Sequence, residues 1–289
     1  MPIIPFSQLL SAAAAADYAV AYFEPWDELS LLAILRGAEG VRSPIIVGLS
    51  GIYTPPLLGM DRRFFPALAS VGRLASEQAR VPVAYLFNET PHWDWAVAAL
   101  DLGFNVVMYS NPADDPETHV ARTSELARLA AGHGVEVESE LGSLMHGDSG
   151  NTDPEAAADF VARTGVQALG ITAGNRHLTT GNYQLDVALI ARLAAAVPVP
   201  LVLHGGSGAT DDDLRGAVAA GIRQVNYGTA QRLAFLEQLS VSLCRDWRAL
   251  DPHELLGTGL LDDLTRPGYE AVGELVAEKC ALLGSAGRG

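Results

Sequence analysis

Short apolar segments alternate with longer amphipathic segments along the whole chain. The apolar segments have the length of buried strands and are separated by stretches rich in turn residues. Eight of them are predicted to be strands: residues 18–23, 44–49, 81–87, 105–109, 135–141, 168–173, 200–204 and 224–227.

The intervening segments carry apolar residues at helical spacing, as in residues 121–131 and 185–196. Strands that alternate with helices indicate a parallel sheet, because parallel neighbours need a crossover connection. Eight such units predict an α/β fold, a (β/α)8 TIM barrel. The alternative is an open doubly wound sheet, which the absence of GxGxxG after the first strand disfavours.

Helix starts and ends support this division of the chain. Asp153 precedes a proline, and Thr210 precedes three aspartates, as is typical of helix N-termini. After the last strand, residues 230 to about 250 and 269–283 predict additional C-terminal helices that can cover a barrel or contact a partner.

Composition agrees with one compact domain over residues 1–289. The length is near the roughly 250 residues of a typical barrel, and 49% of the residues are hydrophobic while 18% are charged. A net charge of −15 excludes the basic surface of a nucleic-acid-binding protein and disfavours an anionic membrane. Without an apolar run long enough to span a bilayer, we expect a cytoplasmic protein. Cys244 and Cys280 do not predict a disulfide framework.

Polar residues gather at the ends of the predicted strands. In an α/β barrel the catalytic groups lie at the carboxyl ends of the strands, so these side chains should meet at one rim. They are Glu24, Asn88, Glu89, Ser110, Asn111, Glu138, Glu140, Asn175, His177, His204 and Asn226.

Two glycine-containing turns follow the seventh and eighth strands, where barrels most often bind phosphate. Glycine permits close backbone approach to an anion, and a following helix offers free N–H groups. A lone glycine turn is often only a tight turn, but two in adjacent barrel units imply a phosphorylated substrate. The predicted binding residues are Gly205, Gly206, Ser207, Gly208, Asn226, Gly228 and Thr229.

His177 and His204 are candidate metal ligands, and Glu89 can complete a His2Glu set that suits zinc. A single histidine is more often a hydrogen-bonded structural residue. The metal site is therefore a hypothesis about three residues taken together.

Four motifs give a more specific indication: LVLHGGSG at residues 201–208, VNYGT at 225–229, ESELG at 138–142 and LGF at 102–104. In order and spacing, from residue 18 to about 235, the chain resembles the class II fructose-bisphosphate and tagatose-bisphosphate aldolases. The resemblance implies a zinc enzyme, with His204 and His177 as ligands and a phosphorylated ketose as substrate. It also implies a homodimer or a higher homo-oligomer.

The third strand departs from that family. Where the family has a proton-transferring aspartate and a third histidine ligand, this chain has Asn88 and Glu89. An amide cannot act as a general acid or base near neutral pH. Glu138, Glu140 and Glu24 are then candidates for proton transfer, although Glu140 can instead order a ligand or a loop. The predicted catalytic residues are Asn88, Glu138 and Glu140.

The first functional hypothesis is a lyase that makes or breaks a C–C bond in a phosphorylated ketose through a metal-stabilised enediolate. A Schiff-base route is disfavoured, because the single lysine, Lys279, lies in a predicted terminal helix. Two alternatives remain: an isomerase or condensing enzyme that works without this metal, and a phosphometabolite-binding protein without turnover.

Overall fold

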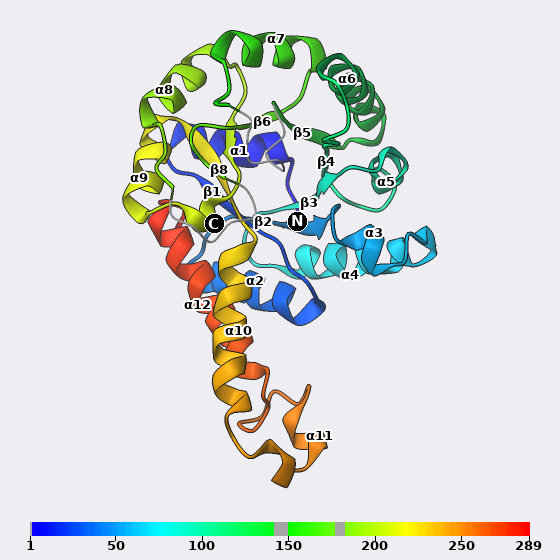
Figure 1. Cartoon of the computed structure of the whole chain (residues 1–289), viewed down its shortest axis with the longest axis vertical. Coiled ribbons are helices and arrows are strands. Elements are labelled where there is room, and N and C mark those ends of the chain that lie inside the picture. The colour runs from blue at the N-terminus through cyan, green and yellow to red at the C-terminus, as the bar shows by residue number, and fades with distance from the viewer. Residues whose placement is uncertain (1, 142–149, 177–182) are drawn as a thin grey trace.

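The computed structural model describes residues 2–141, 150–176 and 183–289. Its eight strands form a closed parallel barrel in chain order, β1 to β8, with β8 pairing again with β1 (Figure 1). The strands are β1 Val20–Phe23, β2 Ile45–Ser50, β3 Val83–Thr90, β4 Val106–Tyr109, β5 Glu136–Glu140, β6 Ala168–Ile171, β7 Leu201–Leu203 and β8 Ile222–Tyr227. The predicted TIM barrel is confirmed, and the open doubly wound sheet is wrong, because Tyr22 of β1 lies opposite Asn226 of β8.

Helices surround the barrel and connect its strands (Figure 1). The α-helices are α1 Phe6–Ala15, α2 Glu28–Gly40, α3 Thr54–Leu57, α4 Phe65–Gln78, α5 Trp93–Ala99, α6 Pro116–His133, α7 Pro154–Thr164, α8 Val187–Ala196, α9 Asp211–Ala220, α10 Thr229–Leu243, α11 Pro252–Leu255 and α12 Arg266–Leu282. Short 3-10 helices are η1 Arg62–Phe64, η3 Gly206–Gly208 and η4 Trp247–Ala249.

Two predicted helix starts are confirmed in detail. The Asp153 side chain accepts hydrogen bonds from the first backbone N–H groups of α7, and Thr210 accepts one from Asp213 at the start of α9. These side chains satisfy N–H groups that have no partner within the helix.

Alternation along the strands divides the apolar residues into two clusters. Residues that point outward, such as Phe87 and Tyr109, pack between the strands and the surrounding helices. Residues that point inward, such as Leu86 and Met108, pack with α1, whose apolar face includes Leu10. Helix α1 therefore closes the amino-terminal end of the barrel with apolar contacts, and the polar interior residues lie toward the other end.

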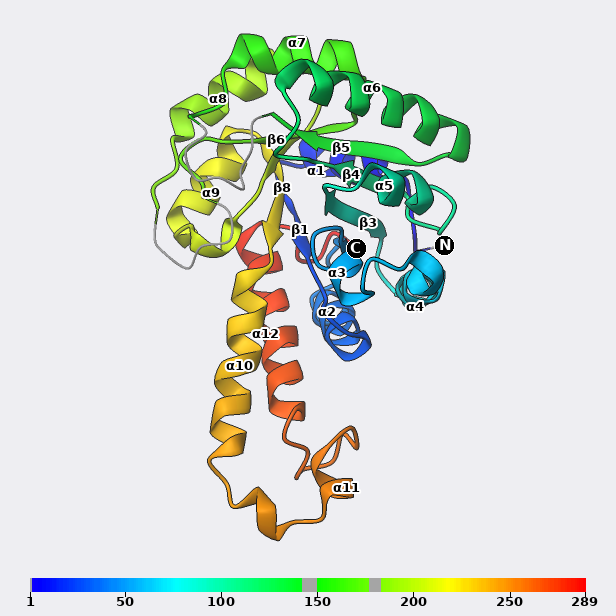
Figure 2. The same ribbon diagram turned by 45° about the vertical axis from the view of Figure 1, so that its right-hand side comes forward.

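The predicted C-terminal helices are present. Helices α10 and α12 form an antiparallel pair that extends away from the barrel (Figure 2), and α12 also packs against α2. Helix α10 ends at Leu243, earlier than the predicted residue 250, and η4 follows it. The chain then returns to the barrel, where the Ala19 N–H donates to the Leu283 carbonyl.

Both cysteines are free thiols, Cys244 exposed and Cys280 buried. Among the described helices, none is both long and apolar enough to cross a bilayer.

Candidate functional site

The carboxyl ends of the strands meet around a cavity of about 150 Å³. Strands β1, β3 and β8 and the loop after β7 contribute its walls. Of the residues singled out from the sequence, those that line it are Glu24, Asn88, Glu89, Gly205, Ser207, Asn226, Gly228 and Thr229.

Strand β3 ends in an irregularity that changes the direction of one key side chain. Glu89 has a φ of +52°, in the left-handed region, and the pairing of β3 with β4 shifts register between Phe87 and Thr90. A non-glycine residue in this conformation costs on the order of 1–3 kcal/mol. In a regular strand Glu89 would point outward, because Asn88 points inward. The bulge instead lets both side chains line the cavity.

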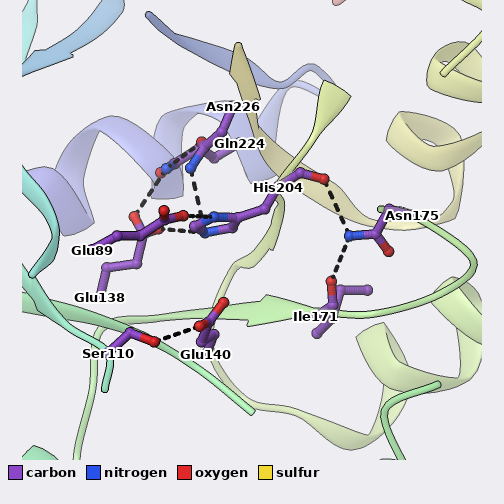
Figure 3. A network of polar contacts seen from close by, with 9 residues as sticks. All are labelled: Glu89, Ser110, Glu138, Glu140, Ile171, Asn175, His204, Gln224 and Asn226. Carbon is purple, nitrogen blue, oxygen red and sulfur yellow. Dashed lines mark hydrogen bonds and ion pairs between the residues drawn. The ribbon is translucent and has the colours of Figure 1, made fainter. Parts of the chain in front are cut away.

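His204 lies at the centre of the polar network shown in Figure 3. Its Nδ1 atom contacts Oε1 of Glu89, and its Nε2 atom lies 3.1 Å from Oε1 of Glu138. All three side chains are buried. Burial alone would lower the pKa of His204, but the two carboxylates raise it well above its ordinary value. The imidazole can thus bear a positive charge between two carboxylates, or bind a cation through a ring nitrogen.

Glu138 is held by more than His204. Gln224 donates a hydrogen bond of 2.9 Å from Nε2 to Oε2 of Glu138 and another of 2.8 Å to Oδ1 of Asn226. Gln224 was not predicted from the sequence as a site residue. The sequence does indicate that Gln224 belongs to the site, because it is two residues before Asn226 on β8 and so faces the same side of the strand.

Glu140 lies on β5 two residues after Glu138. Oε1 accepts a hydrogen bond of 2.5 Å from the Ser110 hydroxyl, and Oε2 has no hydrogen-bond partner within the described structure. Burial raises the pKa of Glu140 to about 7, against the opposing charge of His204. A carboxyl group with this pKa can both release and accept a proton near neutral pH.

Gly170 of β6 brings this carboxyl group close to the histidine. A Cβ atom at this position would lie 3.1 Å from Cβ of Glu140 and 3.2 Å from Nε2 of His204. A larger residue would therefore push Glu140 and His204 apart, and the glycine keeps them in one compact cluster.

Asn88 lies in the cavity wall near Glu89. Its side chain is buried, and Oδ1 has no hydrogen-bond partner among the described residues. A buried amide oxygen without a partner is costly, so a bound hydroxyl or amine of a ligand would satisfy it.

The two glycine turns meet beside the cavity, as predicted. Gly205 has a φ of +76°, and a Cβ atom there would lie 2.3 Å from the Arg176 carbonyl oxygen. Only glycine fits this turn. The Ser207 hydroxyl accepts a hydrogen bond from the backbone of Ala230, which joins the loop to the first turn of α10. Gly206 and Gly208 are buried within η3 and support the loop rather than line the cavity.

The predicted metal ligands are only partly described. Glu89 and His204 are in contact, whereas His177 falls outside the described residues. Within the described ranges there is no group of three or more His, Cys, Asp or Glu side chains arranged to hold a metal ion. Asn175 links the end of β6 to the residue that follows β7. Its Nδ2 donates to the carbonyl oxygens of Ile171 and His204 (Figure 3).

The cavity residues that were not predicted from the sequence include one charged side chain. Arg232, in the first turn of α10, lines the cavity and pairs with Glu24 at 2.9 Å. The candidate site residues were taken from the carboxyl ends of the predicted strands, and Arg232 lies on a helix instead.

The raised pKa of Glu140 predicts a specific dependence of stability on pH. Between its ordinary value of 4.5 and about 7, the folded protein holds a proton that the unfolded chain releases. Stability should therefore fall as pH rises through this window, by on the order of 3 kcal/mol. Glu140→Gln removes the titration, so this variant should gain stability relative to the wild type between pH 4.5 and pH 8, measured by urea unfolding.

The exposed Glu125 provides the matched control. Glu125→Gln should change stability by a nearly constant amount across the same pH range. Parallel curves for the wild type and Glu140→Gln would contradict the assignment of a raised pKa to Glu140.

Comparison with known proteins gives the same fold and extends over nearly the whole chain. A family profile described as "Fructose-bisphosphate aldolase class-II" matches residues 4–288. The chain is 31% identical to a fructose-bisphosphate aldolase of Thermus caldophilus, over 97% of this chain and 98% of the relative. It is also 30% identical to the protein YdjI of Escherichia coli K12, over 94% of each chain.

A solved structure agrees with these similarities. The crystal structure of the YdjI aldolase from Escherichia coli K12 superposes with a TM-score of 0.82 at 28% identity, covering 99% of both chains. The profile, the relatives and the barrel with its strand-end polar cluster lead to one conclusion: the chain belongs to the class II fructose-bisphosphate aldolase family.

Proposed function

We propose that the protein is a lyase that makes or breaks a C–C bond beside the carbonyl of a phosphorylated ketose. The observation that carries the proposal is a single cavity with the glycine turns on one wall and Glu89 on another. A substrate can thus place an anionic group at the turns and its reacting carbons near the Glu89–His204 pair.

The phosphate would lie against the loop at Gly205 and the amino-terminal end of α10. There the backbone N–H groups and the positive end of the helix dipole favour an anion. Ser207 and Thr229 add hydroxyl groups, and both residues line the cavity. Asn226, between these turns and His204, would hydrogen-bond a polar group of the ketose chain.

Glu89 and His204 would hold a divalent cation, with His177 as the proposed third ligand. Carboxylate oxygen and imidazole nitrogen are suitable zinc donors, and the described pair is already in contact inside the barrel. When bound, the cation would polarise the substrate carbonyl and stabilise the negative charge that develops beside it. The carboxylate of Glu89 would make it a weaker Lewis acid than a third histidine would.

Glu140 is the proposed proton-transfer group. Its pKa of about 7 suits that role, Ser110 fixes one oxygen, and the other has no partner in the described structure. Asn88 would donate or accept a hydrogen bond at a substrate hydroxyl but cannot move a proton. Glu138 would fix the orientation of the His204 ring, which it contacts at 3.1 Å.

A Schiff-base mechanism has no suitable amine. Lys279 lies on α12, where Nζ pairs with Asp211 at 3.2 Å and with Glu278 at 2.9 Å. It does not line the cavity. The reaction would therefore depend on charge stabilisation rather than on a covalent imine.

Hydrogen exchange into a phosphorylated ketone tests the half-reaction without knowledge of the aldehyde partner. The metal-loaded wild type in D2O should exchange hydrogen for deuterium on the carbon beside the carbonyl of dihydroxyacetone phosphate, followed by NMR. Glu140→Gln should slow this exchange by about 10²- to 10⁴-fold, the usual contribution of a general base. Glu125→Gln should leave the rate unchanged.

Other outcomes favour other functions. Exchange that persists unchanged after removal of divalent metals would support the metal-independent isomerase or condensing enzyme. Tight binding of several ketose phosphates without exchange would support a binding protein and contradict the lyase.

We also propose that the chain forms a homodimer or a higher homo-oligomer through the projecting α10–α12 pair. Four large apolar side chains of α10 are exposed in the single chain, namely Leu233, Leu236, Val241 and Leu243. In the chain segment that connects α10 to α12, Leu256, Leu260 and Leu261 are also exposed. Clustered exposed apolar residues usually mark a surface that another protein covers.

Light scattering during size-exclusion chromatography tests this assembly. The wild type should elute at twice the mass of one chain or more, and Val241→Glu combined with Leu236→Glu should shift it toward the monomer. Leu57→Glu, at an exposed leucine of α3 outside the pair, should leave the mass unchanged. A monomeric wild type at micromolar concentration would contradict the proposal.

A further inference from the structure

Tyr22 of β1 has a buried hydroxyl group, and the residue lines the same cavity as Asn88 and Glu89. Its ring belongs to the inward-facing apolar cluster, together with Ile46 and Leu86. Tyr22 therefore lies where the apolar interior of the barrel meets its polar end.

The Tyr22 hydroxyl group has no hydrogen-bond partner among the described residues. A buried tyrosine hydroxyl usually has one, because an unpaired polar group inside a protein is costly. The carboxylates of Glu24, Glu89 and Glu138 are near enough to affect it electrostatically, yet none of them accepts its proton. The hydroxyl group therefore keeps a donor available for a ligand in the cavity.

The surroundings of Tyr22 keep the proton on its hydroxyl group. Burial raises the pKa of Tyr22 well above its ordinary value, and the negative charges of Glu24 and Glu89 raise it further. Glu138 acts in the same direction, whereas Arg232 opposes the rise. Tyr22 is thus a neutral hydrogen-bond donor near neutral pH and cannot act as a general base.

The barrel fixes the position of this donor before a ligand binds. Tyr22 lies opposite Ile46 of β2 and Asn226 of β8 in the strand pairing. A tyrosine side chain has only two rotatable torsions, and this ring is packed in the apolar cluster. A donor that needs no rearrangement during a reaction is the kind that stabilises a developing charge most effectively.

Two unpaired groups of the cavity wall suit different parts of a ketose. The Asn88 Oδ1 atom can only accept a hydrogen bond, so a substrate hydroxyl group is its matching partner. The Tyr22 hydroxyl can donate, and a carbonyl oxygen that becomes negative is the acceptor that gains most from a buried donor. The proposed reaction produces such an oxygen beside the Glu89–His204 pair.

We propose that Tyr22 is a catalytic residue whose hydroxyl group donates a hydrogen bond to the substrate carbonyl oxygen as negative charge develops on it. This inference rests on the proposed lyase function and adds a neutral donor to it. The electron pair of the broken C–H or C–C bond moves toward the carbonyl oxygen. The proton released from carbon goes to Glu140, and Tyr22 keeps its own proton throughout.

The competing interpretation is structural, with the Tyr22 hydroxyl contributing only to packing. Tyr85 of β3 offers a matched control, because it is also a buried strand tyrosine but lies in the outward-facing cluster. Its hydroxyl group donates a hydrogen bond of 3.0 Å to the Ala69 carbonyl, and the residue does not line the cavity. Replacing either tyrosine by phenylalanine removes one oxygen atom and keeps the ring.

The two variants should have opposite effects on stability and on rate. Tyr22→Phe removes an unpaired buried hydroxyl, so the urea midpoint of the ligand-free protein should stay unchanged or rise. Tyr85→Phe breaks a hydrogen bond, so its midpoint should fall, while the rate of hydrogen exchange into the ketone should stay at the wild-type value.

Hydrogen exchange into dihydroxyacetone phosphate, measured over a range of ketone concentrations with metal-loaded protein, tests the role of Tyr22. Tyr22→Phe should lower the saturating exchange rate by about 10²- to 10³-fold, the usual effect of losing one donor to a developing oxyanion. Its KM should stay within roughly threefold of the wild-type value, because the hydrogen bond strengthens mainly in the transition state.

The infrared spectrum of bound dihydroxyacetone phosphate, labelled with ¹³C at the carbonyl carbon, gives a readout that does not require turnover. A donor at the carbonyl oxygen weakens the C=O bond. The C=O stretching band should therefore lie at lower frequency in the wild type and in Tyr85→Phe than in Tyr22→Phe.

The outcomes separate this inference from the proposed function. An unchanged exchange rate in folded Tyr22→Phe would overturn the role of Tyr22 and leave the lyase standing. A raised KM at an unchanged saturating rate would place Tyr22 at a neutral part of the substrate and also overturn the proposal. A lower urea midpoint together with weaker ketone binding in Tyr22→Phe would identify a structural residue. Wild-type protein that binds the ketone without exchange would refute the lyase itself, and with it the catalytic role of Tyr22.

Discussion

The contact between Glu89 and His204 across the barrel interior is the interaction on which the rest of the site depends. It requires a left-handed residue at the end of β3, where Glu89 adopts a φ of +52°. Such a conformation is maintained only when neighbouring contacts stabilise it. Here His204 supplies such a contact, and Glu138 and Gln224 in turn hold the opposite side of the His204 network. The strained residue and the buried polar network therefore support each other.

The barrel separates its stabilising core from its chemistry along one axis. At the amino-terminal end, α1 fills the interior with apolar side chains that include Phe6 and Leu10. At the other end, Glu138, Glu140 and His204 are buried together, which is costly unless their charges are paired or shared with protons and cations. This arrangement explains why Glu140 keeps its proton to about pH 7 while His204 gains one readily. The apolar contacts at the amino-terminal end would offset much of the free-energy cost of burying these charged side chains.

The periodicity of the sequence was sufficient for the fold, because buried parallel strands and amphipathic helices have different patterns. Strand alternation also places Asn88, Glu138 and His204 on inward-facing positions. It could not place Glu89, since a bulge reverses the direction of one residue without a clear sequence signal. Arg232 was missed because it lines the cavity from a helix and pairs with Glu24, a contact between residues distant in sequence. The glycines after the seventh and eighth predicted strands located the two turns, whereas the family resemblance could not decide what Asn88 and Glu89 do in place of the usual residues.

We propose that Glu89, together with His204, holds a divalent cation at the position where the family has a histidine. Metal content by mass spectrometry on protein purified without a histidine tag tests it, for the wild type, Glu89→Gln, His204→Ala and the control Glu125→Gln. We expect near-stoichiometric divalent metal in the wild type and in Glu125→Gln. Both site variants should lose most of it, since removal of a ligand weakens a metal site at least as strongly as the roughly 10- to 100-fold effect of losing a supporting contact. Full metal occupancy in folded Glu89→Gln, or active wild-type protein without metal, would contradict a metal site at Glu89 and His204.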